Sequence, residues 1–181
     1  MTGTRQGGQA GAGARPGAAP KSASGQNEPW KPGADRHWLA EAIELSRRCP
    51  PSESAFSVGA ILVGPDGAVI ATGFSRERDP HDHAEEVALA RAASAGAARR
   101  LARATLYSSL EPCAARASRP RPCAELIIEA GLRRVVIAWL EPPVFVEGGG
   151  AARLRAAGVT VIEIPELAAT ARAVNAHLLP R

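Results

Sequence analysis

The chain has 181 residues and a formal net charge of +4. That length suits one core of ordinary size, so we expect a single folded domain. Hydrophobic residues make up 45% of the chain and aromatic residues only 4%, which predicts an aliphatic core rich in small side chains. No stretch approaches the roughly 18 consecutive apolar residues of a membrane span, so no membrane partner is expected.

Residues 1–33 differ from the rest, because Gly, Ala, Ser, Gln and Pro dominate them without apolar periodicity. Such a stretch buries too little surface to offset its chain entropy. We therefore predict a disordered tail over 1–33 and a folded domain over 34–181. The tail lacks the apolar run of a secretory signal, and it also lacks the amphipathic helix of its alternative, a transit peptide.

The basic charge of the chain lies mostly in this tail. Four basic residues and one acidic residue give the tail +3, which leaves +1 for the domain. A nucleic-acid partner is therefore not expected. Three cysteines, an odd number, fit a secreted disulfide framework poorly. We expect a cytoplasmic protein whose reduced thiols are available to a metal.

The first predicted element is a helix over 35–48, with Asp35 as its N-cap, that ends at Cys49-Pro50-Pro51. Apolar runs over 58–63 and 68–73 flank a Gly-Pro-Asp-Gly turn and predict a hairpin. An alanine-rich helix is predicted over 83–99.

Strands and helices then alternate. We predict strands over 105–110, 135–139 and 159–164, and helices over 123–130, 150–157 and 166–179. Gly131 and Gly158 follow two of these helices, where a left-handed cap is needed. The pattern predicts an α/β fold of three layers, α/β/α, with a mixed sheet of about five strands.

A split motif carries the chemistry: His83-Ala84-Glu85, then Pro112-Cys113, then Pro122-Cys123. This order is the signature of zinc-dependent deaminases, in which three residues hold the metal and a glutamate moves protons. Catalytic zinc uses three protein ligands and keeps a fourth position for water. His83, Cys113 and Cys123 supply that count.

Glu85 is the predicted catalytic residue, which takes a proton from water and delivers it to the substrate. Residues two apart in a helix point to different sides, so His83 must lie at the helix start, where the backbone is still non-helical. Cys123 is predicted to open a helix, where free amides favour a thiolate.

Simpler interpretations exist for each residue. A lone His-x-Glu is common, and two cysteines are often buried apolar residues. Their order and context favour the metal site. His81 is a competing ligand, but no glutamate follows two residues on, so a loop role is expected. Cys49 is expected to be a free thiol, and His37 and His177 are expected in surface or packing roles.

The sequence resembles the cytidine deaminase-like superfamily, and within it the deaminase domain of the bifunctional riboflavin-biosynthesis deaminase/reductase. Nine residues separate Cys113 and Cys123, in LEPCAARASRPRPCAELIIEAGLRRVVIA. In that branch a Leu-Glu-Pro-Cys leads through a basic loop to Pro-Cys. Weaker similarity lies in Val146, Gly148 and Gly150, and in Ala173-Val174-Asn175.

The resemblance implies a cytidine deaminase-like fold, a zinc cofactor and a hydrolase that acts on a cyclic amidine C–N bond. The implied reaction uses water to deaminate 2,5-diamino-6-ribosylamino-4(3H)-pyrimidinone 5′-phosphate, a pyrimidine nucleotide of riboflavin biosynthesis. There is no space for the reductase domain, so a stand-alone deaminase is expected. A homo-oligomer is also implied, since the superfamily commonly forms dimers or tetramers.

The sequence departs from that branch at the substrate side. An asparagine expected before the first strand is replaced in Ala55-Phe56-Ser57-Val58-Gly59, and histidines expected between the cysteines are replaced by Ala and Arg. Arg116, Arg119 and Arg121 are candidates to hold the 5′-phosphate, with a solvated loop as the alternative. Glu111 of the Leu-Glu-Pro-Cys motif is a further substrate-binding candidate.

Two alternative functions stay open. The first is a deaminase of dCMP, cytidine or a specialised-metabolite base, which the missing asparagine suggests. The second is a non-catalytic zinc-stabilised domain that binds a ligand, although a purely structural zinc site would normally close its fourth position. A nucleic-acid editor is not expected, because aromatic residues for base stacking are few.

Overall fold

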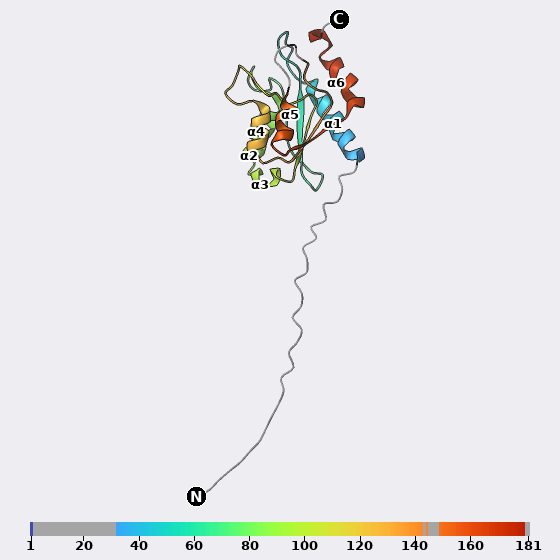
Figure 1. The fold of residues 1–181 in the computed structure, drawn as a ribbon. Coiled ribbons are helices and arrows are strands. Elements are labelled where there is room, and N and C mark those ends of the chain that lie inside the picture. Colours follow the sequence, from blue (N-terminus) through green and yellow to red (C-terminus); the bar gives the residue numbers. More distant parts are fainter. Residues whose placement is uncertain (2–31, 143, 145–148, 180–181) are drawn as a thin grey trace.

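The computed structural model describes residues 1, 32–142, 144 and 149–179 (Figure 1). Nearly all of the tail predicted over 1–33 lies outside these residues, as do Val146 and Gly148. In the part of the chain that the structure describes, no helix is long and apolar enough to cross a membrane.

The centre of the fold is a five-stranded sheet with the order β2-β1-β3-β4-β5. Strand β1 runs antiparallel to both β2 and β3, whereas β3, β4 and β5 run parallel. The predicted mixed sheet and hairpin are therefore confirmed. The strands are β1 (Gly59–Val63), β2 (Val69–Phe74), β3 (Thr105–Ser108), β4 (Arg134–Ile137) and β5 (Thr160–Glu163).

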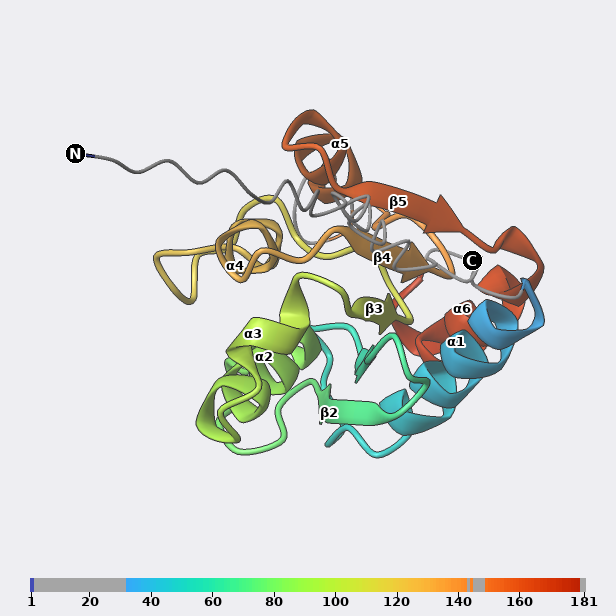
Figure 2. The same ribbon diagram turned by 90° about the horizontal axis from the view of Figure 1, so that it is seen from below.

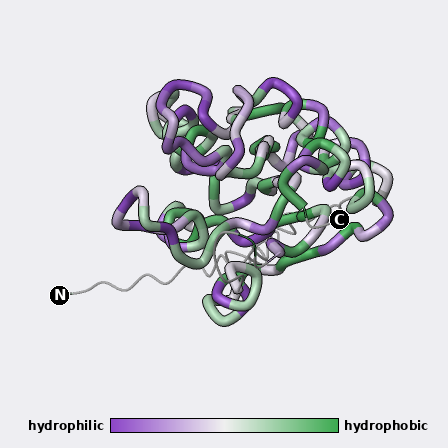
Figure 3. Tube along the Cα trace, turned by 90° about the horizontal axis from the view of Figure 1, so that it is seen from above, coloured by the Kyte–Doolittle hydropathy of each residue, from purple (hydrophilic) through white to green (hydrophobic). Residues whose placement is uncertain are grey.

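Helices cover both faces of this sheet, which confirms the three layers (Figure 2). Helices α1 (Pro32–Ser46) and α6 (Ala168–Val174) lie on one face. The other face carries α2 (Ala84–Ser94), α4 (Cys123–Glu129) and α5 (Gly150–Ala156). Hydrophobic residues follow the central strands and hydrophilic residues the outer loops and helices (Figure 3). The core is aliphatic as predicted, with fully buried side chains such as Leu62, Leu106 and Val135.

The predicted N-cap role of Asp35 is wrong. Helix α1 begins at Pro32, a residue whose fixed backbone suits the first helical turn, and Asp35 lies within the helix. Its buried carboxylate accepts hydrogen bonds from the Tyr107 hydroxyl at 2.9 Å and from Arg134 Nη2 at 2.6 Å. These partners lie on β3 and β4, so Asp35 ties the helix layer to the sheet.

Two predicted helices are interrupted. The helix predicted over 83–99 is α2 followed by the short α3 (Ala98–Leu101), because Gly96 adopts a left-handed backbone with φ of 70°. The last predicted helix is a 3-10 turn η1 (Pro165–Leu167), then α6, then a second turn η2 (Ala176–Leu178). The break between α6 and η2 falls at Asn175, whose side chain is hydrogen-bonded to Ser57.

The topology brings four loops to one edge of the sheet. The carboxyl ends of the parallel strands β3 and β4 lie at this edge, and ligands of α/β proteins commonly bind there. Because β1 is antiparallel to β3, the start of β1 and the end of β2 lie at the same edge. The loops are 50–58, 75–83, 109–122 and 138–142.

Candidate metal centre and active-site cavity

The three predicted metal ligands converge at this edge of the sheet. His83 immediately precedes α2 with an extended backbone, φ −96° and ψ 150°, which confirms that it lies at the non-helical start. Cys113 follows β3, and Cys123 is the first residue of α4. Their ligand atoms all lie within 4.8 Å of one another.

The spacing of these atoms fits zinc. Nδ1 of His83 lies 3.6 Å from Cys113 Sγ and 3.5 Å from Cys123 Sγ. A tetrahedral zinc ion with ordinary Zn–N and Zn–S bonds holds nitrogen and sulfur about 3.6 Å apart. Among the described residues, these three form the one group of His, Cys, Asp and Glu side chains arranged to hold a metal, and His81 is not part of it.

The two cysteine thiols shift each other's pKa in opposite directions. Hydrogen bonding to Cys123, followed by contact with His83, lowers the pKa of Cys113 to about 4. The same hydrogen bond and burial raise the pKa of Cys123. The amide that opens α4 donates from Cys123 N to Cys113 Sγ at 3.3 Å, so the helix start also stabilises the Cys113 thiolate.

Glu85 lies beside the metal ligands in the first turn of α2, with only 3% of its surface exposed. Its Oε1 accepts a hydrogen bond of 2.6 Å from Ser108 Oγ at the end of β3. Burial raises the pKa of Glu85, and the bond from Ser108 opposes that rise. Ser108 was not predicted from the sequence, where it is one hydroxyl in a strand of buried residues.

A cavity of about 540 Å³ opens onto this group. Such a volume suits a small-molecule ligand. His83, Glu85 and Cys113 form one side of the cavity, and residues of the 50–58 loop form another. Glu141, which the sequence analysis missed, also lines it. Burial, reinforced by the negative charges of Cys113, Glu85 and Glu111, raises the pKa of Glu141 to about 8.

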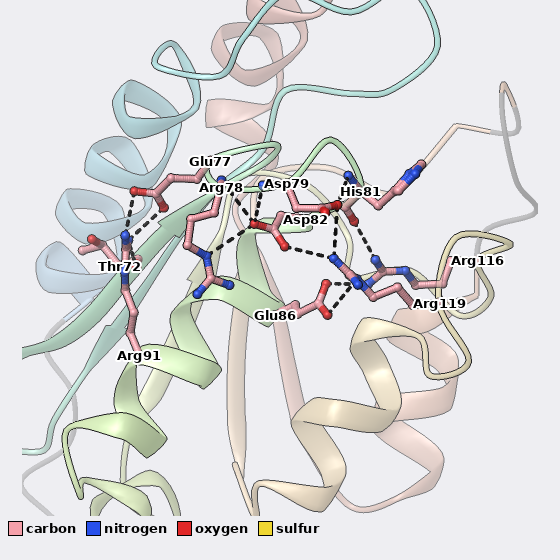
Figure 4. A network of polar contacts seen from close by, with 10 residues as sticks. All are labelled: Thr72, Glu77, Arg78, Asp79, His81, Asp82, Glu86, Arg91, Arg116 and Arg119. Carbon is pink, nitrogen blue, oxygen red and sulfur yellow. Dashed lines mark hydrogen bonds and ion pairs between the residues drawn. The ribbon is translucent and has the colours of Figure 1, made fainter.

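Two of the three loop arginines bind carboxylates next to the metal ligands (Figure 4). Arg116 lines the cavity, pairs with Glu86 at 3.0 Å and donates to the His81 carbonyl at 2.7 Å. Arg119 pairs with Glu86 at 3.2 Å and with Asp79 and Asp82 at 3.3 Å each. Their charges are thus compensated within the protein, and the loop between the cysteines is fastened to the approach of α2.

The other two candidates lie differently. Arg121 pairs with Glu129 of α4, has 57% of its side chain exposed, and is not among the described residues that line the cavity. Glu111 does line it, but its carboxylate accepts hydrogen bonds from the backbone N–H groups of Glu141 at 2.9 Å and Ala151 at 2.7 Å. Glu111 therefore fastens two loops of the site together.

The fold, the ligand set and the buried carboxyl together define a zinc-dependent deaminase. Residues 32–139 match the sequence model of the cytidine and deoxycytidylate deaminase zinc-binding region, and the chain belongs to this family. Family membership and the three converging ligands confirm zinc as the cofactor, and the family is one of deaminases.

More particular similarity is to deaminases of riboflavin biosynthesis. The diaminohydroxyphosphoribosylamino-pyrimidine deaminase of Schizosaccharomyces pombe is 38% identical over 133 residues, which cover 74% of this chain and 33% of that protein. The riboflavin biosynthesis protein RibD of Aquifex aeolicus is 34% identical over 128 residues, 70% of this chain and 34% of that protein. The chain thus spans about a third of the length of these relatives.

Solved structures give the same result. RibD of Acinetobacter baumannii superimposes with a TM-score of 0.67 at 32% identity, over 81% of this chain and 39% of that one. A C-terminal deletion mutant of the Rib2 deaminase of Aspergillus oryzae superimposes with a TM-score of 0.63 at 27% identity, over 80% of this chain and 98% of that truncated one. The resemblance and the fold class inferred from the sequence are confirmed.

Proposed function

We propose that this chain catalyses the hydrolytic deamination of diaminohydroxyphosphoribosylaminopyrimidine, a nucleotide of riboflavin biosynthesis. The observation that carries the proposal is a buried glutamate beside a three-ligand zinc set, within a cavity of about 540 Å³. The 38% identity to a relative named for this activity supports the choice of substrate.

In the proposed mechanism His83, Cys113 and Cys123 hold the zinc ion. When bound, zinc supplies Lewis acidity that makes water a stronger acid. Glu85 takes a proton from the water while the water oxygen adds to the amine-bearing carbon. Glu85 then passes that proton to the ring nitrogen. Glu85 then carries the remaining hydroxyl proton to the amino group, the C–N bond breaks, and ammonia leaves.

The surroundings of Glu85 suit this work. A buried carboxyl with a raised pKa holds a proton more readily than an exposed one, so it can deliver the proton as well as accept it. The bond from Ser108 orients the carboxyl through Oε1, and Glu85 lines the cavity.

Among the tentative substrate-binding residues, Arg116 is the arginine that we assign to the 5′-phosphate. It lines the cavity, and its described bonds to Glu86, His81 and Ser118 use three of the five N–H donors of a guanidinium. Arg119 and Arg121 act through the loop that they fasten, and Glu111 acts by holding the cavity wall.

We further assign the domain to residues 34–181, place the protein in the cytoplasm, and propose that it assembles as a homo-oligomer with no membrane or nucleic-acid partner. Size-exclusion chromatography with light scattering measures the assembly, and a monomeric mass at micromolar concentration contradicts it.

Ammonia release tests the reaction. Zinc-loaded protein, with about one zinc per chain by elemental analysis, is offered the diaminopyrimidinone nucleotide, dCMP and cytidine. We expect the highest kcat/KM with the first. A preference for dCMP or cytidine contradicts the riboflavin assignment, and zinc binding without ammonia from any of the three favours the non-catalytic alternative.

A further inference from the structure

Arg76, two residues after the end of β2, has an unusual backbone. Its φ is 60°, and among the described residues no other non-glycine residue has a positive φ. For an L-residue with a long side chain this left-handed conformation costs about 1 kcal/mol or more, and it persists only where the surroundings hold it. Such residues cluster at functional sites.

The guanidinium of Arg76 is hydrogen-bonded to the segment that precedes β1, and these bonds hold the residue in place. Nε and Nη2 both donate to the Pro50 carbonyl, at 3.2 and 2.8 Å. Nη1 donates to the carbonyls of Ala55 and Phe56, at 3.2 and 2.9 Å. Nη2 also donates to Ser57 Oγ at 3.0 Å. A guanidinium has five N–H donors, so the whole group is taken up by the 50–57 segment.

The backbone N–H of Arg76 binds a second segment of the site. Its N–H donates to the carbonyl of Asp82 at 2.9 Å, and Asp82 directly precedes the metal ligand His83. One residue therefore joins the segment that leads into the metal centre to the 50–57 segment. Both segments line the cavity, as does Arg76 itself.

Asn175, which directly follows α6, binds the same segment through Ser57. Its Oδ1 accepts from the Ser57 N–H at 2.7 Å and its Nδ2 donates to the Ser57 carbonyl at 3.0 Å, with Asn175 buried. Within the 50–57 segment, Ala55 supplies no polar side chain of its own. Arg76 and Asn175 therefore supply most of the side-chain hydrogen bonds that hold this wall, and His177 adds one contact to the Ser52 carbonyl at 3.0 Å.

We propose that Arg76 is a positioning residue that sets the distance between the 50–57 wall and Glu85, and thereby the placement of the substrate ring. The inference rests on the proposed deaminase function of the cavity. A substrate held between two walls loses both affinity and alignment when one wall moves, and small misplacements at a reacting centre cost large factors in rate.

Three variants of the zinc-loaded full chain test it. Arg76→Gly removes the guanidinium but suits the left-handed backbone. Arg76→Lys keeps the charge, but its single ammonium cannot reach all four acceptors. Arg91→Lys is the control, because Arg91 also makes three side-chain hydrogen bonds, to Glu77 and Thr72, and does not line the cavity (Figure 4).

For both Arg76 variants we expect KM for the nucleotide to rise at least about fivefold and kcat/KM to fall about 30-fold or more. Zinc content should not change. A variant that merely populates the folded state less would lower the apparent kcat and leave KM unchanged. Asn175→Ala should raise KM in the same way, and its combination with Arg76→Gly should lose less than the product of the two effects, since both act on one segment.

Hydrogen–deuterium exchange gives a readout that needs no activity. Arg76→Gly should speed exchange in peptides covering 50–58 and leave those covering 105–110 unchanged, and Arg91→Lys should leave both sets of peptides unchanged. Unchanged exchange over 50–58 overturns the inference, as does a normal KM in both Arg76 variants of an active enzyme. A wild-type enzyme that releases no ammonia contradicts the proposed function instead, and the exchange data still decide the role of Arg76.

Discussion

Removal of the Ser108 hydroxyl tests how much the orientation of Glu85 contributes to catalysis. The Ser108→Ala variant loses a bond of 2.6 Å to the carboxylate, and both partners are buried. A hydrogen bond to a charged group contributes about 1.5–3 kcal/mol. If that energy holds Glu85 in the reactive geometry, kcat/KM falls about 10- to 160-fold, because each 1.36 kcal/mol is a factor of ten.

Ser109→Ala is the matched control. Its hydroxyl accepts a hydrogen bond from the Gly59 N–H at 3.1 Å, which joins β1 to the end of β3 without touching Glu85. Loss of this neutral bond costs about 1 kcal/mol of unfolding free energy, and we expect kcat/KM to stay within about threefold of wild type.

A coupled assay of ammonia release measures both variants, with urea unfolding as the measure of stability. The reasoning fails if Ser108→Ala retains kcat/KM within about threefold of wild type. It also fails if Ser109→Ala loses as much activity, since the effect then reflects general damage at the end of β3.

Further predictions concern the proton carrier, the metal and a second acid. Glu85→Gln keeps the shape of the side chain but cannot accept a proton, so kcat should fall about 10²- to 10⁴-fold while zinc stays bound; ammonia release near the wild-type rate rejects the role. Chelation of zinc should abolish activity and make the Cys113 thiolate, which lines the cavity, react with a disulfide reagent in addition to Cys49. Reaction of Cys113 or Cys123 before chelation contradicts the ligand set. The raised pKa of Glu141, about 8 against 4.5 for the ordinary group, means that the folded state keeps a proton that the unfolded state releases, so stability falls as pH rises through this window. The free energy of unfolding of Glu141→Gln, measured with urea, should therefore rise by about 1 kcal/mol relative to wild type between pH 4 and pH 9. The figure is discounted because the side chain is only partly buried and zinc offsets the thiolate charge. A difference between the two proteins that does not change with pH refutes the prediction.

Local chemistry made much of the site predictable from the sequence. The His-x-Glu spacing requires an extended residue at the start of a helix, and His83 has that backbone. Gly131 and Gly158 adopt the predicted left-handed conformation, with φ of 74° and 82°. Each of these features depends on a few neighbouring residues, so the sequence alone contains the necessary information.

Features that depend on distant partners were missed. Asp35 has the residue type of an N-cap, but Arg134, 99 positions away, binds its carboxylate. The pairing of Glu86 with Arg116 and Arg119 was not predicted either. Nothing in the local sequence distinguishes a compensated arginine from a free one, because compensation is decided by which loops the sheet brings together.

The hydrogen bonds between Asn175 and Ser57 have a consequence for folding of the chain during translation. The two residues lie 118 positions apart, so the 50–57 wall of the cavity leaves the ribosome long before the residue that fastens it. At synthesis rates of about 5–20 residues per second, the delay is roughly 6–24 s. During that time Arg76 and the packing of Phe56 against Trp139 can hold the wall without Asn175. A nascent chain that lacks residue 175 can therefore have its metal ligands in place before its substrate-binding surface is complete.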